Sequence, residues 1–541
     1  MRGALCAVFL LALVGLLPRA IRVGMTGDYV DSIGRITAQD EALYGNSAIA
    51  MAREGDWLTP HFMGRPALYK PPMLIWISAL SARIFGITPF DLRVPLTAIA
   101  ALAIAIIFLW GAEAGGITAG ACAALLVFGN RLFHTLSTLV MTDALLLAFT
   151  AGAVYAIFSD PWLESRRWLW AFAACTAGAI LTKGVAGVFP IVILGLFWVA
   201  VRPKERPALR RVLLAAGLAI ALTLPWFLYQ LAAHPRWFWT EHIAVEILGF
   251  GTGAPPQTSR QSSVIFYLLR LVAIDPILFS AVVVAIPAFA RKLRERASGP
   301  ILLAAWVALT GSAALAWQYR NASYLLPLVP ALALIAACHG PFAEQRHASW
   351  MLGLILAGLV MKSALPDAPW GLNYRAGTIN PVAPALAKYC EGRRAKSLIV
   401  VDAVDDLYAA VLPLQLRYAT VGARLGAGPY GMPFRDLGIA LGVEDYIHLD
   451  AARQRYAARL REWDVNSAAP VGTVITAASA KELEALVRAA PDTDFLIADR
   501  YRAVIRDSGH EYVPAAPGFG FLMANGPGAG TERPAAWTCR M

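Results

Sequence analysis

Long apolar runs separated by short basic loops fill this chain as far as about residue 365. A bilayer offers no water to satisfy backbone N–H and C=O groups, so each run must form a helix that bonds its own backbone. About 20 apolar residues are enough to cross the hydrocarbon. With 58% hydrophobic and 15% charged residues, the sequence predicts a polytopic α-helical membrane protein.

The basic loops indicate the orientation. ESRRW (164–168), VRPKERPALRR (201–211) and RKLRERA (291–297) lie between apolar runs, and such loops stay on the cytoplasmic side. This rule accounts for the net charge of +11, so we expect no nucleic-acid partner. The N-terminus is then inside and the C-terminus outside. Hydropathy predicts about thirteen spans, at 4–21, 73–87, 94–111, two short helices that enter and return within 116–140, 143–158, 168–181, 184–201, 212–231, 264–290, 301–317, 322–338 and 350–365.

The composition changes after about residue 365. SLIVVD (397–402), VGTVITA (471–477) and TDFLIAD (493–499) are typical of buried strands, and SAKELEALVRAA (479–490) of an amphipathic helix. We therefore predict a membrane domain at 1–365 and an exported α/β domain at 366–541. In an oxidising compartment Cys390 and Cys539 either form a disulfide or stay free, and the sequence leaves both open.

Two loops on the outer side, 22–72 and 232–263, are long enough to build a site. In the first, Asp40 and Glu41 begin a half-apolar stretch that predicts a helix to about residue 54. An acid at a helix N-terminus is stabilised by the helix dipole. The same carboxylate at the membrane interface could take a proton from an attacking hydroxyl. From the residues alone these two interpretations have equal weight.

Other ionisable residues fall at the same face. Asp143 begins an apolar span and is either a functional acid or a helix cap. Lys183 lies in a turn between spans, and Lys70 in YKPPM either extends to the interface or binds a phosphate. His242 is a metal ligand or a polar bridge, and Arg320 an interfacial anchor or a partner for a lipid phosphate.

Several blocks occur in a familiar order. They are DEALYGNSAIAMAREGDWLTPHFMGRPALYKPPMLIWISALSARIFG, TDALLLAF, LTKGVAG, LPWFLYQLAAHPRWFWTEHI and YLLPLVPALAL. Together they resemble the bacterial polyprenyl-phosphate-sugar-dependent glycosyltransferases of the GT-C class. This group contains the lipid A aminoarabinose transferases and the protein O-mannosyltransferases.

The resemblance implies an inverting transfer of a sugar from a membrane-embedded polyprenyl phosphate at the periplasmic face of a bacterial inner membrane. The acceptor is lipid A, another glycan or a protein. By position in the motifs, Asp40 resembles the general base and Asp143 the second acid, and both are predicted to be catalytic. Lys70 and Lys183 resemble cations near the donor phosphate. The predicted substrate site is completed by Glu41, Tyr69, His242 and Arg320.

One departure concerns Tyr69. Aminoarabinose transferases typically have Glu before Lys-Pro-Pro, where it helps to bind a metal and the acceptor, and this chain has Tyr69 instead. The resemblance therefore does not imply that this chain binds a metal or is specific for aminoarabinose. No cofactor is assigned, and a divalent metal is an open alternative.

Two other classes of protein are weighed against an enzyme. A secondary transporter also has many spans and ionisable residues, but its polar groups usually gather near the midplane. A noncatalytic scaffold predicts that Asp40 and Asp143 border no common cavity. Because the acids and cations gather at one face, a glycosyltransferase whose partners are the donor lipid, an acceptor and membrane lipids is favoured.

Overall fold

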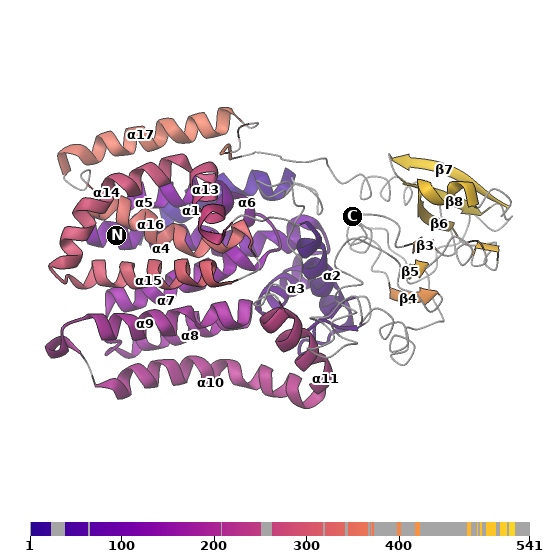
Figure 1. Ribbon diagram of the computed structural model, residues 1–541, viewed down its shortest axis with the longest axis horizontal. Coiled ribbons are helices and arrows are strands. Elements are labelled where there is room, and N and C mark those ends of the chain that lie inside the picture. The colour runs from indigo at the N-terminus through magenta and orange to yellow at the C-terminus, as the bar shows by residue number, and fades with distance from the viewer. Residues whose placement is uncertain are drawn as a thin grey trace.

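The computed structural model describes residues 2–22, 38–62, 65–206, 208–249, 262–317, 320–340, 345–365, 368 and 370–372, and then 398–401, 417–421, 473–477, 484, 487–488, 494–504, 509–516 and 519–524. Up to residue 372 the described chain is mainly helical, and six strands are described beyond it. The long helices lie side by side in a bundle, with the strands near one end of it (Figure 1). The predicted fold class is confirmed.

Eight segments of the described chain are long and apolar enough to cross a membrane. The helices are α1 (Arg2–Arg22), α2 (Ala38–Glu54), α3 (Met73–Phe85), α4 (Pro89–Gly115), α5 (Ile117–Phe128), α6 (Arg131–Leu136), α7 (Thr142–Ser159), α8 (Arg166–Lys183), η1 (Gly184–Val188), α9 (Phe189–Ala200), α10 (Leu209–Ala233), α11 (Pro235–Trp237), η3 (Phe238–Gly249), α13 (Ser263–Ile274), α14 (Pro276–Arg294), α15 (Ser298–Ala316), η4 (Ala322–Leu328), α16 (Val329–His339) and α17 (Gln345–Ala364).

Helix α4 begins at the face of the bundle where α1 ends. Arg93 of α4 is fully buried and donates from Nη1 to the backbone O of Ala20, at 3.3 Å. Ala20 and Arg93 therefore lie at one face of the bundle, and α3, with 13 residues or about 20 Å, is too short to cross easily from it to the other. The predicted span at 73–87 is wrong, because a short apolar helix can pack beside α2 instead. We call this face the site end.

The loops at the opposite end of the bundle carry many of the basic residues. Arg211 donates from Nε to the backbone O of Leu163 at 3.0 Å, so the turn before α8 meets the first turn of α10. The guanidinium of Arg206 also donates to the backbone O of Val201, at 3.2 Å. These hydrogen bonds satisfy two backbone carbonyls, one of which, that of Val201, lies at the C-terminus of α9. We call this the basic end.

Helices α5 and α6 return the chain from the basic end to the site end. The predicted break at Gly129–Arg131 is confirmed, with Asn130 capping α6 by accepting a hydrogen bond from the backbone N of Phe133, at 3.1 Å. Just beyond α6, the O of Ser137 accepts from Thr97 Oγ1 near the start of α4, at 3.1 Å. The pair therefore crosses once, and the predicted entry and return within 116–140 is wrong.

Helices α4 and α5 approach each other at a glycine. A Cβ on Gly120 would lie 2.5 Å from the O of Phe108 and 2.8 Å from the N of Ala112. Small residues permit such backbone contact between membrane helices. We expect Gly120→Leu to separate the two helices and to destabilise the protein by about 1–3 kcal/mol, seen as a lower melting temperature in detergent. Gly195→Leu, where a Cβ meets open space, is the control, and equal melting of both variants would contradict this packing.

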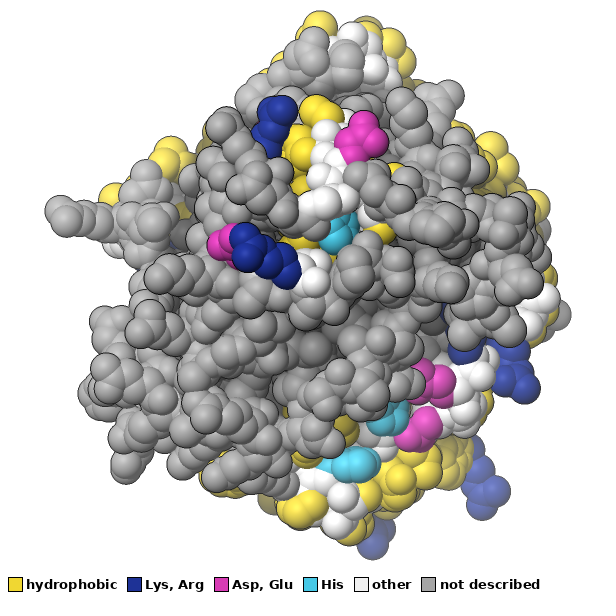
Figure 2. Space-filling model, turned by 90° about the vertical axis from the view of Figure 1, so that its right-hand side faces the viewer, with side chains coloured by type: hydrophobic (Ala, Val, Ile, Leu, Met, Phe, Trp, Pro, Cys, Tyr) yellow, Lys and Arg dark blue, Asp and Glu magenta, His cyan; other side chains and the backbone are white. Residues whose placement is uncertain are grey.

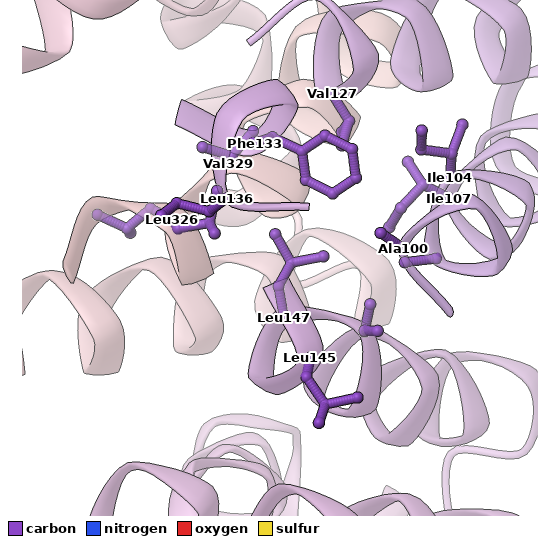
Figure 3. Close-up of a cluster of buried hydrophobic side chains, with 14 of the residues drawn as sticks. Ala100, Ile104, Ile107, Val127, Phe133, Leu136, Leu145, Leu147, Leu326 and Val329 are labelled. Atoms are coloured by element: carbon purple, nitrogen blue, oxygen red, sulfur yellow. The ribbon is translucent and has the colours of Figure 1, made fainter. Parts of the chain in front are cut away.

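Helix α6 packs into the core of the bundle. Phe133 and Leu136 are fully buried, together with residues of α4, α5, α7 and η4. Figure 3 shows Phe133 pointing between Val127 of α5 and Leu147 of α7. This packing holds the segment that precedes α7, and so it fixes the start of α7 at the site end.

A buried ion pair joins α17 to two helix breaks. The Nζ atom of Lys362 lies 3.0 Å from Oδ1 of Asp275 and also donates to the O of Gly129. Asp275 caps α14 by accepting from the N of Leu278 at 3.2 Å, and accepts from Asn130 Nδ2 at 3.2 Å. The two charged side chains are only 1% and 5% exposed. Because Asp275 caps a helix here, the predicted continuous span at 264–290 is divided into α13 and α14.

The C-terminal strands form one mixed sheet with the order β4-β5-β3-β6-β8-β7. The strands β3 to β6 pair in parallel, while β8 and β7 are antiparallel. The predicted strands at 397–402, 471–477 and 493–499 are confirmed. The bounds are β3 (Leu398–Val401), β4 (Arg417–Val421), β5 (Thr473–Ala477), β6 (Asp494–Ala498), β7 (His510–Ala516) and β8 (Phe519–Ala524), with η6 (Asp499–Val504) after β6.

Some predictions concern residues that the structure does not describe. Cys390 and Cys539 lie outside the described residues, as does most of the predicted helix at 479–490. The four cysteines within the described residues, Cys6, Cys122, Cys175 and Cys338, are free thiols. The domain boundary after residue 365 stays a prediction.

Candidate functional site

Helix α2 brings Asp40 and Glu41 to the site end. Both lie in its first turn, and the predicted helix to residue 54 is confirmed. Asp40 is half-buried, whereas Glu41 is 2% exposed and points into the bundle. Successive residues on a helix face different directions, so these two adjacent acids contact different parts of the protein.

Glu41 ties three segments together. Its carboxylate accepts from Arg93 Nε at 2.7 Å and from Arg93 Nη2 at 2.8 Å, a two-point contact of the strongest kind. Oε1 also accepts from the backbone N of Val140 at 3.0 Å. Glu41 therefore holds α2 against α4 and against the segment that leads into α7. This placement assigns Glu41 to the framework of the site rather than to its surface.

Asp143 and Lys183 meet, as predicted from topology. Asp143 is the second residue of α7 and is 5% exposed, and Lys183 is the last residue of α8. The Nζ atom of Lys183 lies 2.7 Å from Oδ1 of Asp143. The same ammonium lies 5.4 Å from the ring centroid of Tyr324 in η4, within the range of a cation–π contact.

Glycines position Lys183 at the site end. The chain reverses after α8 at Gly184, which has φ 49°, a backbone conformation that glycine adopts without strain. A Cβ on Gly187 would lie 2.3 Å from the O of Ala179, so η1 folds directly back on α8. The TKGVAG block is therefore a tight reversal whose lysine presents its ammonium to Asp143.

Helix η3 fastens the loop that carries Lys70. Glu241 Oε2 accepts from the backbone N of Leu68 at 2.6 Å, and His242 Nδ1 lies 3.1 Å from the O of the same residue. Both backbone polar groups of Leu68 are thus bonded to consecutive side chains of η3. One helical turn further, Glu246 forms an ion pair with Lys70. The two long loops of the sequence are in this way joined.

His242 is neutral in this setting. It is 5% exposed, stacks on Phe238 at 5.2 Å, and has Gly184 close to its ring. Burial, and then the nearby ammonium of Lys70, lower the pKa of His242 to about 4. Because Nδ1 faces a carbonyl oxygen, we assign the proton to Nδ1, which leaves Nε2 as an acceptor beside Gly184.

The pKa of His242 predicts acid sensitivity. The folded protein keeps this imidazole neutral, while the unfolded chain takes up a proton below about pH 6.5. Stability is therefore unaffected above that pH and is lost as the pH falls from about 6.5 toward 4. We expect the melting temperature of the wild type to fall over this interval more than that of His242→Asn. Parallel pH profiles for the two proteins would contradict the assignment.

The remaining predicted residues lie around this core. Tyr69 is 1% exposed, and its ring centroid lies 5.9 Å from that of Tyr44 in α2. Arg320 lies 6.0 Å above the ring of Phe266 in α13 and just precedes η4, the helix that carries Tyr324. No contact given by the structure links Arg320 to Asp143 or Lys70. In a space-filling view from this end, acidic and histidine side chains lie close together (Figure 2).

The described residues do not fit a metal site. Among them, no three His, Cys, Asp or Glu side chains converge as metal ligands. The residue before Lys-Pro-Pro is Tyr69, whose phenol is a poor metal ligand, and Nδ1 of His242 faces the backbone of Leu68. We therefore derive no chemical step through a metal.

Four residues of this site were not predicted. Arg93 and Tyr324 fall within apolar runs, where an arginine or a tyrosine is most simply an interfacial anchor. Glu241 and Glu246 lie in the second long loop near His242. The sequence showed where these acids are, but not which residues they contact. Only the short spacing of 241, 242 and 246 within one helix hinted that these three side chains reach the same segment of the first loop.

The sequence matches known proteins over part of its length. Residues 69–230 match the family described as dolichyl-phosphate-mannose-protein mannosyltransferase. An undecaprenyl phosphate-alpha-4-amino-4-deoxy-L-arabinose arabinosyl transferase from Enterobacter sp. (strain 638) is 26% identical over 356 residues, 62% of this chain and 61% of that one. The protein of the same name from Pseudomonas savastanoi pv. phaseolicola is 29% identical over 218 residues, 38% of this chain and 40% of that one. The chain thus spans less than two thirds of these two relatives.

The fold matches over nearly the whole chain. ArnT from Cupriavidus metallidurans bound to undecaprenyl phosphate superposes with a TM-score of 0.65, covering 96% of this chain and 98% of that chain at 14% identity. At this level of identity the likeness establishes a shared fold, and the chemistry must be argued from the residues above.

Proposed function

We infer that this chain is a membrane glycosyltransferase of the GT-C class, which moves a sugar from a polyprenyl-phosphate donor to an acceptor. The fold and the family match support the class. The relatives named above are transferases that use an undecaprenyl-phosphate sugar. No comparison favours the transporter alternative.

One observation carries the proposal. The start of α2 is joined through Glu41 to Val140, three residues before Asp143, and Asp143 in turn contacts Lys183. Two acids and a cation from distant parts of the chain therefore gather at one end of the bundle. A scaffold without a site would have no need of this convergence.

We propose the following roles. Asp40, the half-buried acid, takes the proton from the acceptor hydroxyl, which is a poor nucleophile until it is deprotonated. The acceptor oxygen then bonds to the anomeric carbon while the bond from that carbon to the phosphate oxygen breaks. Lys70 and Lys183 stabilise the charge that develops on the leaving phosphate. Asp143 holds the Lys183 ammonium in place, and Glu41 holds α2.

We also propose an orientation and a location. The basic loops gather at the end opposite the site, which supports a cytoplasmic basic end and a periplasmic site in a bacterial inner membrane. The sheet of the C-terminal region then lies on the periplasmic side. A donor lipid reaches such a site from within the bilayer, so no cytoplasmic nucleotide-sugar site is needed. The acceptor is proposed as lipid A, another glycan or a protein.

The test compares cell envelopes with and without the gene. Glycolipids and glycoproteins are extracted and their masses determined, with complementation by wild-type protein as the control. We expect at least one lipid or protein to carry an added sugar mass only when the protein is present. Identical envelopes, with the protein demonstrably in the membrane and its donor lipid supplied, would refute the proposal. The molecule that gains the mass identifies the acceptor.

A further inference from the structure

Glu246 has no part in the roles given so far, yet it contacts one of the candidate phosphate-binding cations. We propose that Glu246 promotes release of the polyprenyl phosphate product by competing with it for Lys70. This inference rests on the proposed function, because it needs Lys70 to contact the phosphate. It assigns a residue to the last step of the reaction, after the sugar has left.

The geometry keeps Glu246 close to Lys70. The two side chains form an ion pair and are only 9% and 19% exposed. Their backbones cannot separate easily, because η3 is bonded to both backbone groups of Leu68, two residues before Lys70. A phosphate oxygen that contacts the ammonium therefore lies within a few ångströms of this carboxylate. Water screens such a partly buried charge poorly.

The reaction changes the charge on the phosphate. The donor is a phosphodiester with one negative charge. When the bond between the anomeric carbon and the phosphate oxygen breaks, the electron pair stays on that oxygen and the lipid becomes a phosphomonoester. A phosphomonoester with a second pKa near 6 carries about 1.5 to 2 negative charges at pH 7. The product is therefore more negative than the donor at the same position.

Repulsion from a fixed carboxylate grows with the charge that it faces. A like charge within about 4–6 Å disfavours the more highly charged form of a group. Glu246 thus weakens the binding of the monoester more than that of the diester. Without Glu246, the Lys70 ammonium would bind the doubly charged product more tightly than the donor. With Glu246 beside it, the ammonium favours the donor, and the product leaves faster.

The experiment measures binding of two probes to purified full-length protein in nanodiscs. The probes are undecaprenyl phosphate and its methyl ester, which carries the single charge of the donor. We expect Glu246→Gln to bind undecaprenyl phosphate about tenfold more tightly, with a clearly smaller gain for the methyl ester. The conservative variant Glu246→Asp should keep the wild-type ratio of the two affinities. An unchanged ratio in Glu246→Gln would overturn the proposal.

A second pair of variants separates this inference from the proposed function. In Lys70→Gln both probes should bind more weakly, and the double variant Glu246→Gln with Lys70→Gln should bind undecaprenyl phosphate more weakly than Glu246→Gln alone. If Lys70→Gln binds both probes as the wild type does, Lys70 is not a phosphate ligand and its role in the proposed function fails too. If Lys70→Gln weakens both probes while Glu246→Gln leaves the ratio unchanged, only the role of Glu246 is wrong.

Discussion

Asp40→Asn is expected to lower the rate of sugar transfer by about 10²–10⁴-fold, the range for loss of a general base. The substitution keeps the size of the side chain and the ability of the residue to begin a helix. It removes the negative charge and with it the capacity to accept the proton of the acceptor hydroxyl. The loss should therefore appear in kcat, while binding of undecaprenyl phosphate to Lys70 and Lys183 is unchanged.

The measurement is transfer by purified wild-type and variant protein from the donor lipid to the acceptor that the envelope comparison identifies. Glu54→Gln is a matched control, because Glu54 is an exposed acid at the other end of the same helix α2. It should transfer at the wild-type rate. Equal rates for Asp40→Asn and the wild type, with equal amounts of folded protein, would remove Asp40 as the base.

Lys362→Met is expected to destabilise the protein by about 3–5 kcal/mol, the effect of removing one partner from a buried ion pair. The methionine fills nearly the same volume but leaves the Asp275 carboxylate without its ammonium in a place that is 5% exposed. The O of Gly129 also loses its donor. Because Lys362 is the α17 partner of this ion pair, the docking of α17 should suffer most.

The double variant Lys362→Met with Asp275→Asn tests the cause. An asparagine removes the buried charge and can still accept from the N of Leu278, which caps α14. We expect the double variant to regain most of the stability that the single variant loses, measured as thermal unfolding in detergent. If the double variant is less stable than Lys362→Met alone, the penalty does not come from the unpaired carboxylate.

The candidate site was partly visible in the sequence. Asp143 and Lys183 were expected at one face because each lies at the end of an apolar run, and the structure places them 2.7 Å apart. Asp40 and Glu41 were expected to begin a helix, and they do. What could not be foreseen is that Glu41 turns inward to Arg93, since two acids in one helical turn look alike until the packing around them is known.

The membrane topology was also only partly visible. Hydropathy detects apolar helices but not whether a short one crosses, so α3 was taken for a span although it returns to the site end. The break at Asp275 was missed for a related reason. A single acid among apolar residues costs free energy only if it stays unpaired. The partner of Asp275 is Lys362, which lies far along the chain, so the pairing was not visible in the local sequence.

That this chain spans a membrane many times, that strands follow the helices and that the GT-C motif blocks occur in order could all be read from the residues alone. These properties are local, because each run of residues satisfies its own backbone in the bilayer. Which charges meet became visible only in the folded chain. Glu41 and Arg93 are 52 residues apart, and Lys70 and Glu246 are 176 residues apart. The choice of partner across such distances depends on how helices pack, and that packing turns separate motifs into one site.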